Sequence, residues 1–309
     1  MIRMCVESSF GMVLRPKAPK RSARGNASQV RSEATKLMRR ALLRRGLRAY
    51  STTDVRAALF DLSSPAPLLH DPYLPLVAKP AELGEPTEFL TTVADVIGIR
   101  TRAIDSWLEK PSWPPVRTTK RQIVLLNAGL DTRAYRLGLG QSMTLFEVEH
   151  DEALIALKRS TLSAAGHEPR NVVVDVTASP SVPEDCAKAL LKAGFNPEIP
   201  TRWVAQGPLL QGQANVAELF AMAGVNGGTP ASGLAAQVLE PSWAAELKEL
   251  GFTMEGAEHL MSIDEALDAA KAAGWREKRT LRQADFANDF VRSPSAAFAL
   301  IFADADSDP

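Results

Sequence analysis

Short apolar runs alternate with amphipathic segments through the second half of the chain. Turn residues bound each run, which predicts β-strands at residues 122–126, 144–149, 172–176, 203–206, 235–239 and 297–302. Between the runs, apolar side chains recur at helical spacing and predict helices at residues 151–165, 184–193, 214–223, 242–250 and 263–273. Strands that alternate with helices imply right-handed crossovers and a mainly parallel sheet. We therefore expect an α/β domain at residues 121–309.

Residues 51–120 have a different pattern, which is mostly helical and is interrupted by proline-rich breaks at residues 64–67 and 111–115. Residues 88–108 read as a single helix, because Lys110 and Pro111 end the helical periodicity. We expect this region to form a helical segment in front of the sheet.

The first fifty residues are basic, with 13 Lys and Arg residues against two acidic ones. Apolar side chains recur there at helical spacing, and Lys36, Arg40, Arg44 and Arg48 form a stripe on another side. A basic amphipathic helix of this kind suits an import receptor or a membrane surface. Residues 1–50 are therefore predicted to be a detachable targeting segment that contacts the import machinery.

Residues 47–51 resemble a mitochondrial processing site, so the predicted location is the mitochondrion, with a plastid or the cytoplasm as alternatives. A solvated basic arm that binds polyanions is the alternative to targeting.

Composition excludes several classes of function for the rest of the chain. The net charge is zero overall, yet residues 51–309 hold 23 basic and 34 acidic residues, which argues against nucleic acid as the main partner. The absence of a long unbroken apolar run argues against stable membrane association. Cys5 and Cys186 cannot form a disulfide framework, and a reducing or neutral compartment fits best. The four histidines show no ligand spacing, so no metal site is predicted.

The most informative stretch is residues 122–137, where an apolar strand runs directly into a turn and then into a helix. In an open α/β sheet, nucleotide-like ligands lie in the crevice beyond the carboxyl end of the first strand. Gly129 would let the backbone come close to such a ligand, because glycine has no Cβ. Asp131 is a candidate either for a ligand contact or for the cap of the following helix.

Glu149 ends the second predicted strand, twenty residues after Gly129. An acid at this position can accept hydrogen bonds from both hydroxyls of a ribose. The alternative is that Glu149 caps the next helix.

A nicotinamide dinucleotide requires the pattern Gly-x-Gly-x-x-Gly, but the corresponding residues here are Asn127, Gly129 and Thr132. An adenosyl ligand without phosphates places fewer requirements on glycine at these positions of the turn. The turn therefore favours an adenosyl ligand over a dinucleotide.

Residues 126–137 read LNAGLDTRAYRL and resemble the first motif of the leucine carboxyl methyltransferase family, which typically reads LGAGLDTRAYRL. Four further segments resemble the family in the same order: residues 71–72 (DP), 100–105 (RTRAID), 146–149 (FEVE) and 200–207 (PTRWVAQG). The resemblance covers roughly residues 71–302. It implies a Rossmann-like, doubly wound methyltransferase sheet of seven strands, with an antiparallel final hairpin and an N-terminal helical cover.

The resemblance also implies that S-adenosyl-L-methionine is the cofactor. Eight residues are expected to bind it: Arg100, Asn127, Gly129, Asp131, Glu149, Asp175, Val176 and Gln206. Arg100 would bind the carboxylate of the methionine part through a charge-assisted pair. Glu149 would bind the ribose hydroxyls in place of the usual Asp. Asp175 and Val176 would flank the adenine, with the carboxylate accepting from the exocyclic amine.

Three departures from the family pattern concern the site. Asn127 replaces a glycine, although Asn is among the few residues that tolerate a left-handed backbone. Glu149 is one methylene longer than Asp, so either the ribose shifts or the side chain folds back. The family's Glu-Gly-Leu-x-x-Tyr-Leu segment is QGPLLQG here, at residues 206–212, which removes a negative charge and a tyrosine. We therefore expect a small-molecule methyl acceptor rather than a peptide with a C-terminal leucine.

The sequence thus predicts an S-adenosylmethionine-dependent methyltransferase that acts on a carboxylate or hydroxyl of a small molecule. The main requirement of such an in-line displacement is an acceptor held in near-attack geometry. A carboxylate acceptor is already ionised at neutral pH and needs no general base, so no catalytic residue is predicted. Two alternatives stay open: a pseudoenzyme of the same fold that binds the cofactor without transferring methyl, and a nucleotide-dependent oxidoreductase.

Overall fold

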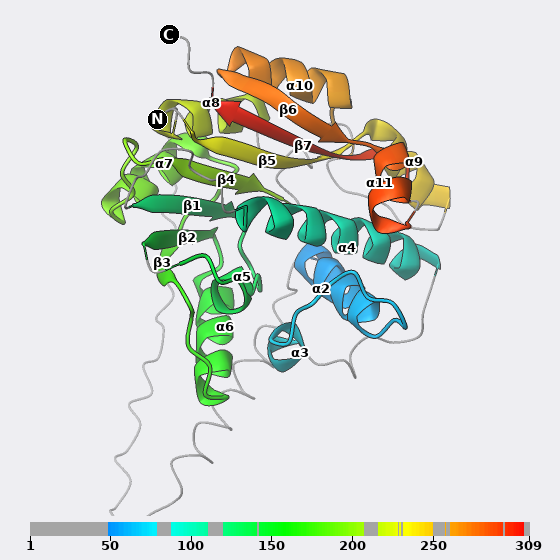
Figure 1. The fold of residues 1–309 in the computed structure, drawn as a ribbon, viewed down its shortest axis with the longest axis horizontal. Helices are drawn as coiled ribbons and strands as arrows, with labels where there is room; N and C mark the ends of the chain where they lie inside the picture. The colour runs from blue at the N-terminus through cyan, green and yellow to red at the C-terminus, as the bar shows by residue number, and fades with distance from the viewer. Residues whose placement is uncertain are drawn as a thin grey trace, which may run out of the picture.

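The structure is a computed structural model that describes residues 49–78, 88–110, 120–140, 142–206, 216–227, 229, 231–249, 257, 260–292 and 294–305 (Figure 1). The predicted targeting helix and the altered stretch after Gln206 lie outside these residues. No helix within the described ranges is both long and apolar enough to cross a membrane.

The centre of the molecule is a seven-stranded sheet with the strand order β3-β2-β1-β4-β5-β7-β6. The strands are β1 Arg121–Leu126, β2 Met143–Glu149, β3 Val172–Thr177, β4 Thr201–Ala205, β5 Gly233–Leu239, β6 Trp275–Leu281 and β7 Phe298–Ala305. Neighbours among β1 to β5 pair in parallel, and β7 runs antiparallel to both β5 and β6. The predicted Rossmann-like α/β fold is confirmed.

Helices cover both faces of the sheet (Figure 1). One face carries α2 Ala49–Leu62, α3 Leu74–Val77, α4 Glu88–Leu108, α5 Arg133–Arg136 and α6 Glu152–Ala164. The other carries α7 Pro183–Lys192, α8 Val216–Gly227 and α10 Ile263–Ala272. Two further helices, α9 Pro241–Glu249 and α11 Gln283–Phe290, bury Trp243 and Phe286 in the same apolar cluster as α2 and α4.

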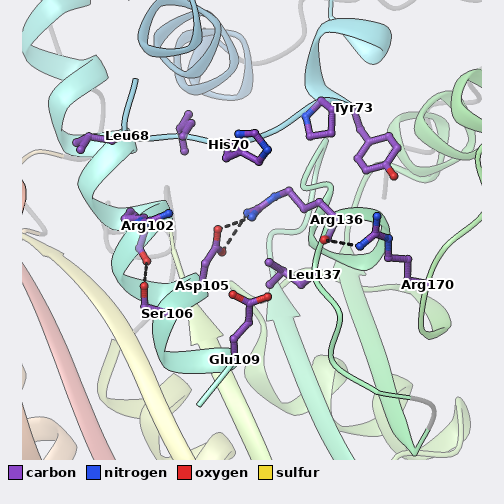
Figure 2. Close-up of a pocket in the computed structure, with 12 residues that line it drawn as sticks. Leu68, His70, Tyr73, Arg102, Asp105, Ser106, Glu109, Arg136, Leu137 and Arg170 are labelled. Atoms are coloured by element: carbon purple, nitrogen blue, oxygen red, sulfur yellow. Dashed lines mark hydrogen bonds and ion pairs between the residues drawn. The ribbon is translucent and has the colours of Figure 1, made fainter. Parts of the chain in front are cut away.

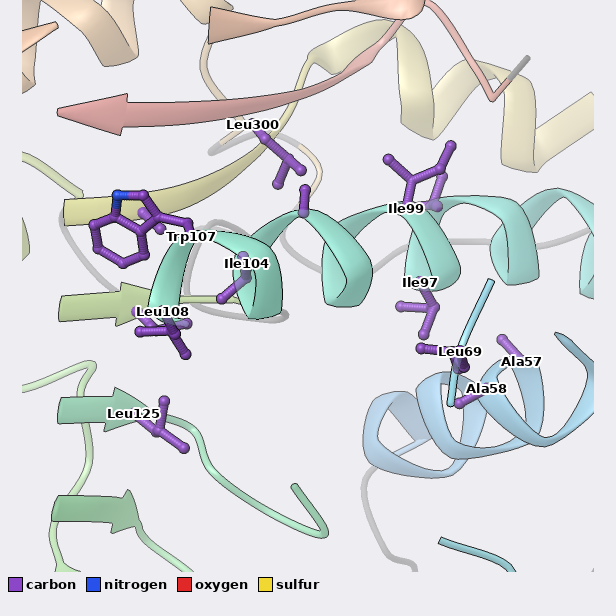
Figure 3. Packing of buried hydrophobic residues seen from close by; sticks show 14 of the residues in the cluster. Ala57, Ala58, Leu69, Ile97, Ile99, Ile104, Trp107, Leu108, Leu125 and Leu300 are labelled. Carbon is purple, nitrogen blue, oxygen red and sulfur yellow. The ribbon is translucent and has the colours of Figure 1, made fainter. Parts of the chain in front are cut away.

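Helix α4 is the main contact between the N-terminal helices and the sheet. It coincides with the predicted helix at residues 88–108. Figure 3 shows Ile97 pointing toward Ala58 of α2, whereas Ile99 points to the opposite side of the helix. Both isoleucines are buried, as are Leu108 near the end of α4 and Leu125 of β1. Burial of each such side chain contributes about 1.5–3 kcal/mol, so this packing holds the helical layer on the sheet.

Strand β6 was not predicted from the apolar pattern, because its sequence WREKRTL consists mostly of charged and exposed residues. It is an edge strand that pairs only with β7, and just its two terminal residues, Trp275 and Leu281, are buried. Charged side chains on an edge strand discourage pairing with other chains, which explains the composition. The antiparallel hairpin itself was implied by the family resemblance.

The strand order reverses at β1. The chain moves outward from β1 to β2 and β3, then returns to β4 on the other side of β1 and continues to β5. Ligands of open α/β sheets bind where the order reverses, in the crevice beyond the carboxyl ends of the strands. The turn after β1 and the first residue after β4 therefore mark the candidate site.

Candidate functional site

The turn at residues 127–131 follows β1 and has an unusual backbone. Asn127 has a φ of 54° and Gly129 has a φ of 47°, so both lie in the left-handed region. The N–H of Ala128 donates to Val148 O at 3.0 Å, which attaches the turn to β2. The expectation that Asn127 tolerates the conformation of the glycine it replaces agrees with this geometry.

Gly129 and Glu149, which are both expected to bind the cofactor, are in direct contact. The Gly129 N–H donates to Glu149 Oε2 at 3.0 Å. A Cβ on Gly129 would lie 3.8 Å from that oxygen and from Leu154 Cδ2, which are ordinary contact distances. Glycine is therefore required here by the positive φ rather than by crowding within the protein.

The longer side chain of Glu149 folds back onto the backbone. Its other oxygen, Oε1, accepts from the Asp151 N–H at 3.1 Å and lies 2.7 Å from His150 Nδ1. The carboxylate is buried, with only 5% of the side chain exposed. Both oxygens of the longer side chain thus accept from backbone N–H groups, and a shift of the ribose stays a prediction. Asp151, rather than Glu149, caps α6, because its side chain accepts from Ala153 N and Leu154 N.

Asp131 is occupied by protein groups. Its Oδ1 accepts from the Arg133 N–H at 2.8 Å at the start of α5, and its Oδ2 contacts the Arg133 guanidinium. Burial opposes ionisation of Asp131, but Arg133, Arg136 and Lys158 outweigh burial and lower its pKa to about 2. The carboxylate therefore stabilises the turn. The N-cap of α5 is Thr132, so Asp131 does not occupy the predicted cap position, and its role toward a cofactor stays a prediction.

Gln206 joins the end of β4 to the same turn. Its side chain donates from Nε2 to Asp131 Oδ2 at 2.9 Å and accepts at Oε1 from Arg133 Nη1 at 3.0 Å. The residue is buried. Both ends of the amide are satisfied by protein groups, so Gln206 holds β4 and the turn after β1 together.

Asp105 connects this cluster to α4 and to a neighbouring cleft. Its carboxylate accepts from Arg133 Nε at 2.7 Å and from Arg136 Nη2 at 3.0 Å. Figure 2 shows the Asp105 and Arg136 side chains pointing toward each other in a cleft of about 320 Å³ between α4, α5 and the segment before α3. Asp71, in that segment, accepts from the Thr132 hydroxyl. The cleft thus adjoins the network that supports the turn.

The buried network continues under α6. Lys158 Nζ donates to Glu147 Oε2 at 2.7 Å and to the Asp131 carbonyl at 2.8 Å, and both ionic side chains are fully buried. Arg159 Nη2 contacts Glu147 Oε2 at 2.7 Å and Asp175 Oδ1 at 2.6 Å. Burial raises the pKa of Glu147 against the attraction of the two cations.

The two residues expected near the adenine lie on different faces of the sheet. In the pairing of β2 with β3, Asp175 lies opposite Glu147. Both residues lie two positions before the ends of their strands, where Glu149 lies opposite Thr177. Asp175 therefore lies in the ion network with Arg159. Val176 is buried in the apolar cluster on the α7 and α8 face. A contact of either residue with adenine stays a prediction.

Arg100 is buried on α4, where its Nη1 donates to Gln237 Oε1 of β5 at 2.9 Å. Because β5 is separated from β1 by β4, Arg100 lies on the opposite side of β4 from Glu149. The eight expected site residues thus form a central group, Asn127, Gly129, Asp131, Glu149 and Gln206, with Arg100 on one side and Asp175 and Val176 on the other.

Five residues that support the turn were not predicted from the sequence: Asp71, Asp105, Arg133, Glu147 and Lys158. Four of them lie in segments that carry the family resemblance, and each of the five resembling segments contributes a side chain to one connected network. The presence of acidic and basic residues in all of these segments was the signal that could have predicted the network. Lys158 had none, because helical spacing alone does not distinguish a buried cation from a solvated one.

Comparison with known proteins gives consistent matches. The sequence profile described as leucine carboxyl methyltransferase matches residues 49–215. A protein of Saccharopolyspora erythraea whose name assigns it as an S-adenosyl-L-methionine-dependent methyltransferase is 30% identical over 69% of this chain and 77% of its own length. A protein of Mycobacterium marinum with the same assignment is 39% identical over 38% of this chain, which spans 36% of that relative.

Among solved structures, a DUF574-family protein from Streptomyces avermitilis superposes with a TM-score of 0.50 at 12% identity, covering 81% of this chain and 96% of its own. At that identity the similarity shows a shared fold.

Proposed function

Because the chain belongs to the leucine carboxyl methyltransferase family, we propose that it transfers a methyl group from S-adenosyl-L-methionine to a carboxylate or hydroxyl of a small molecule. The observation that carries the proposal is the contact between Gly129 N and Glu149 Oε2 where the strand order reverses. In this contact a buried carboxylate lies beside a left-handed turn in which Gly129 has no Cβ, at the edge of the sheet where nucleotide-like ligands of this fold class bind.

The residues present fit that cofactor. A carboxylate can accept up to about four hydrogen bonds, and Glu149 Oε2 has one donor, Gly129 N, within the described part of the chain. It can therefore accept from a ribose hydroxyl. Gly129 presents no side chain toward the crevice. The guanidinium of Arg100 supplies the positive charge that the methionine carboxylate requires.

When bound, S-adenosyl-L-methionine supplies a methyl group already activated by its sulfonium. The task of the chain is then to bind, orient and exclude water. Glu149 and the turn orient the adenosyl part, and Arg100 orients the amino-acid part. Asp175 and Val176 are proposed to contact the adenine. The turn is held in its left-handed conformation by Asp131, Arg133 and Gln206, which therefore act on the cofactor indirectly.

The acceptor is proposed to be a small molecule. Gln206 stands where the family has a glutamate, and its amide is bonded to Asp131 and Arg133. A substrate that depends on an anion at this position would lose an oriented partner, and slight misplacement of an acceptor can cost about a hundredfold in rate. Methylation of a peptide with a C-terminal leucine is therefore not expected.

The experiment is a calorimetric titration of the purified protein with S-adenosylmethionine, its demethylated product and the nicotinamide dinucleotides. Binding of the first two in the micromolar range, with a raised melting temperature, is expected. Binding of a dinucleotide instead would favour the oxidoreductase alternative.

Methyl transfer is tested by incubating the protein with labelled cofactor and either a leucine-terminated phosphatase peptide or a metabolite extract. Label in a small molecule supports the proposal, and efficient labelling of the peptide contradicts the proposed acceptor class. Cofactor binding without any labelling would favour the pseudoenzyme.

A further inference from the structure

Asn127 combines a left-handed backbone with a side chain that is not used to support it. It is the first residue after β1, and its φ of 54° is one that residues with a Cβ rarely adopt. Asparagine can offset this cost when its side chain hydrogen-bonds to the nearby backbone. Asn196 makes a local bond of that kind, because its Oδ1 accepts from the Glu198 N–H at 2.9 Å. Within the described part of the chain, the Asn127 side chain makes no hydrogen bond, either to the turn or elsewhere.

Other amide side chains beside the sheet are occupied by protein groups. Both ends of the Gln206 amide are bonded, and Asn171 Nδ2 donates to two backbone carbonyls at 3.2 Å. Asn127 is half-buried, so its amide loses water without gaining a partner among the described residues. Residues held in a sparsely populated backbone region cluster at ligand sites. Asn127 is therefore a candidate for a side-chain contact with the ligand.

The strand order places Asn127 between the two ends proposed for the cofactor. In the order β2-β1-β4-β5, it follows β1 and lies between Glu149, at the end of β2, and Gln237 of β5, which is bonded to Arg100. A ligand whose ribose binds Glu149 and whose carboxylate binds Arg100 therefore extends across the end of β1. The ammonium of the methionine part is attached to the same carbon as that carboxylate and has three donors, which Arg100 cannot accept.

We infer that Asn127 Oδ1 accepts a hydrogen bond from the ammonium of the methionine part of the cofactor. This inference rests on the proposed function, because it assigns a further contact in the same site. The glycine that the family has at this position can make no side-chain contact. Asn127 is thus a specificity-determining residue, which favours adenosyl ligands that carry an amino-acid part over those that do not.

A merely tolerated replacement of glycine predicts the opposite result. Asn127→Gly restores the family residue and removes the cost of the left-handed backbone, so the melting temperature of the free protein should not fall. If Asn127 were only tolerated, the affinity for the cofactor would stay the same or rise. If Oδ1 accepts from the ammonium, the affinity should fall by about tenfold, the usual loss for a hydrogen bond to a charged group.

The test is calorimetric titration of the full chain and of three variants with the demethylated cofactor, with thermal unfolding of each free protein. Asn127→Gly should bind about tenfold more weakly than the parent protein. Asn127→Asp should bind at least as tightly, because its carboxylate keeps the acceptor and adds a charge opposite to that of the ammonium. Val291→Gly is the matched control, since Val291 has a φ of 55° and lies at the exposed C-cap of α11. Its affinity should not change.

A second ligand tests which part of the cofactor is bound. 5′-Methylthioadenosine has no amino-acid part, so Asn127→Gly and the parent protein should bind it equally. Undiminished binding of the demethylated cofactor by Asn127→Gly, or an equal loss with both ligands, would overturn the inference and leave the proposed function intact. Should Asn127→Gly fail to fold, weaker binding by Asn127→Asp would contradict the assigned acceptor. Failure of the parent protein to bind any adenosyl ligand would overturn the proposed function, and this inference with it.

Discussion

The side-chain amide of Gln206 donates a hydrogen bond to the Asp131 carboxylate at 2.9 Å, although the two residues are 75 positions apart in the sequence. This bond joins the residue after β4 to the turn after β1, and these two segments follow neighbouring strands at the point where the strand order reverses. Gln206, a position at which the chain departs from its family, thereby supports the turn after β1.

Gln206→Met keeps the size of the side chain and removes both of its hydrogen bonds. We expect the free energy of unfolding to fall by about 1–3 kcal/mol, because Asp131 and Arg133 each lose a buried charge-assisted partner. Denaturant unfolding at pH 7 measures this. Gln206→Glu is the matched comparison, because the new carboxylate can still accept from Arg133 but repels Asp131. Its loss of unfolding free energy should shrink as the pH is lowered and the carboxylate is protonated. A fully stable Gln206→Met variant would show that the amide contacts carry no stability.

Glu149→Ala should weaken cofactor binding by about 1–3 kcal/mol, the usual loss for a charged hydrogen-bond acceptor. Because Gly129 N and Asp151 N also lose their acceptor, a smaller loss of folding stability should accompany it. Calorimetry and thermal unfolding measure the two effects separately. Glu152→Ala, in the exposed first turn of α6, is the control. Normal cofactor binding by Glu149→Ala would mean that Glu149 only stabilises the turn.

Arg100→Ala should weaken binding of S-adenosylmethionine by about 1–3 kcal/mol through loss of a charge-assisted pair. The loss should be clearly smaller for 5′-methylthioadenosine, which has no methionine carboxylate. Arg102→Ala is the control, since Arg102 is exposed on the same helix. Equal losses for both ligands would contradict the assigned partner and indicate that Arg100 acts through its bond to Gln237.

Asp131 should make the stability of the fold pH-dependent in acid. Despite its burial, neighbouring cations lower its pKa from 3.8 to about 2 in the folded protein. Its stabilising contribution is therefore complete above about pH 4 and is lost as the pH falls toward 2. A shift of that size corresponds to roughly 2–3 kcal/mol. Unfolding measured from pH 6 to pH 2.5 should show a steeper loss for the parent protein than for Asp131→Asn, and identical slopes would contradict the assignment.

The first fifty residues are predicted to be a targeting segment. Residues 1–55 fused to a fluorescent reporter should direct it to mitochondria or, failing that, to plastids. A protein that begins at Ala49, the first residue of α2, should fold with unchanged stability. A diffuse cytosolic signal would refute targeting.

Much of the fold follows from local patterns. Buried strands such as β1 and β2 are apolar runs bounded by turns, and α4 has a continuous helical period, so each is visible within a short window of sequence. Strand β6 was missed for the same reason, because an edge strand with four exposed central positions has no such run. The short helices α3 and α5 have only four residues each, too few for any period to show.

The sequence by itself determined the fold class, the family and the motif and strand end that hold the two candidate site residues Gly129 and Glu149. Each of these depends on a motif or a strand end that can be recognised locally. Only the tertiary structure decided what the charged motif residues do. Asp131 is bound to Arg133 and Gln206, and Glu147 is bound to Lys158, because burial in a low-dielectric interior forces each ion to find a partner. Those partners are brought together by the strand order, which no short stretch of sequence contains.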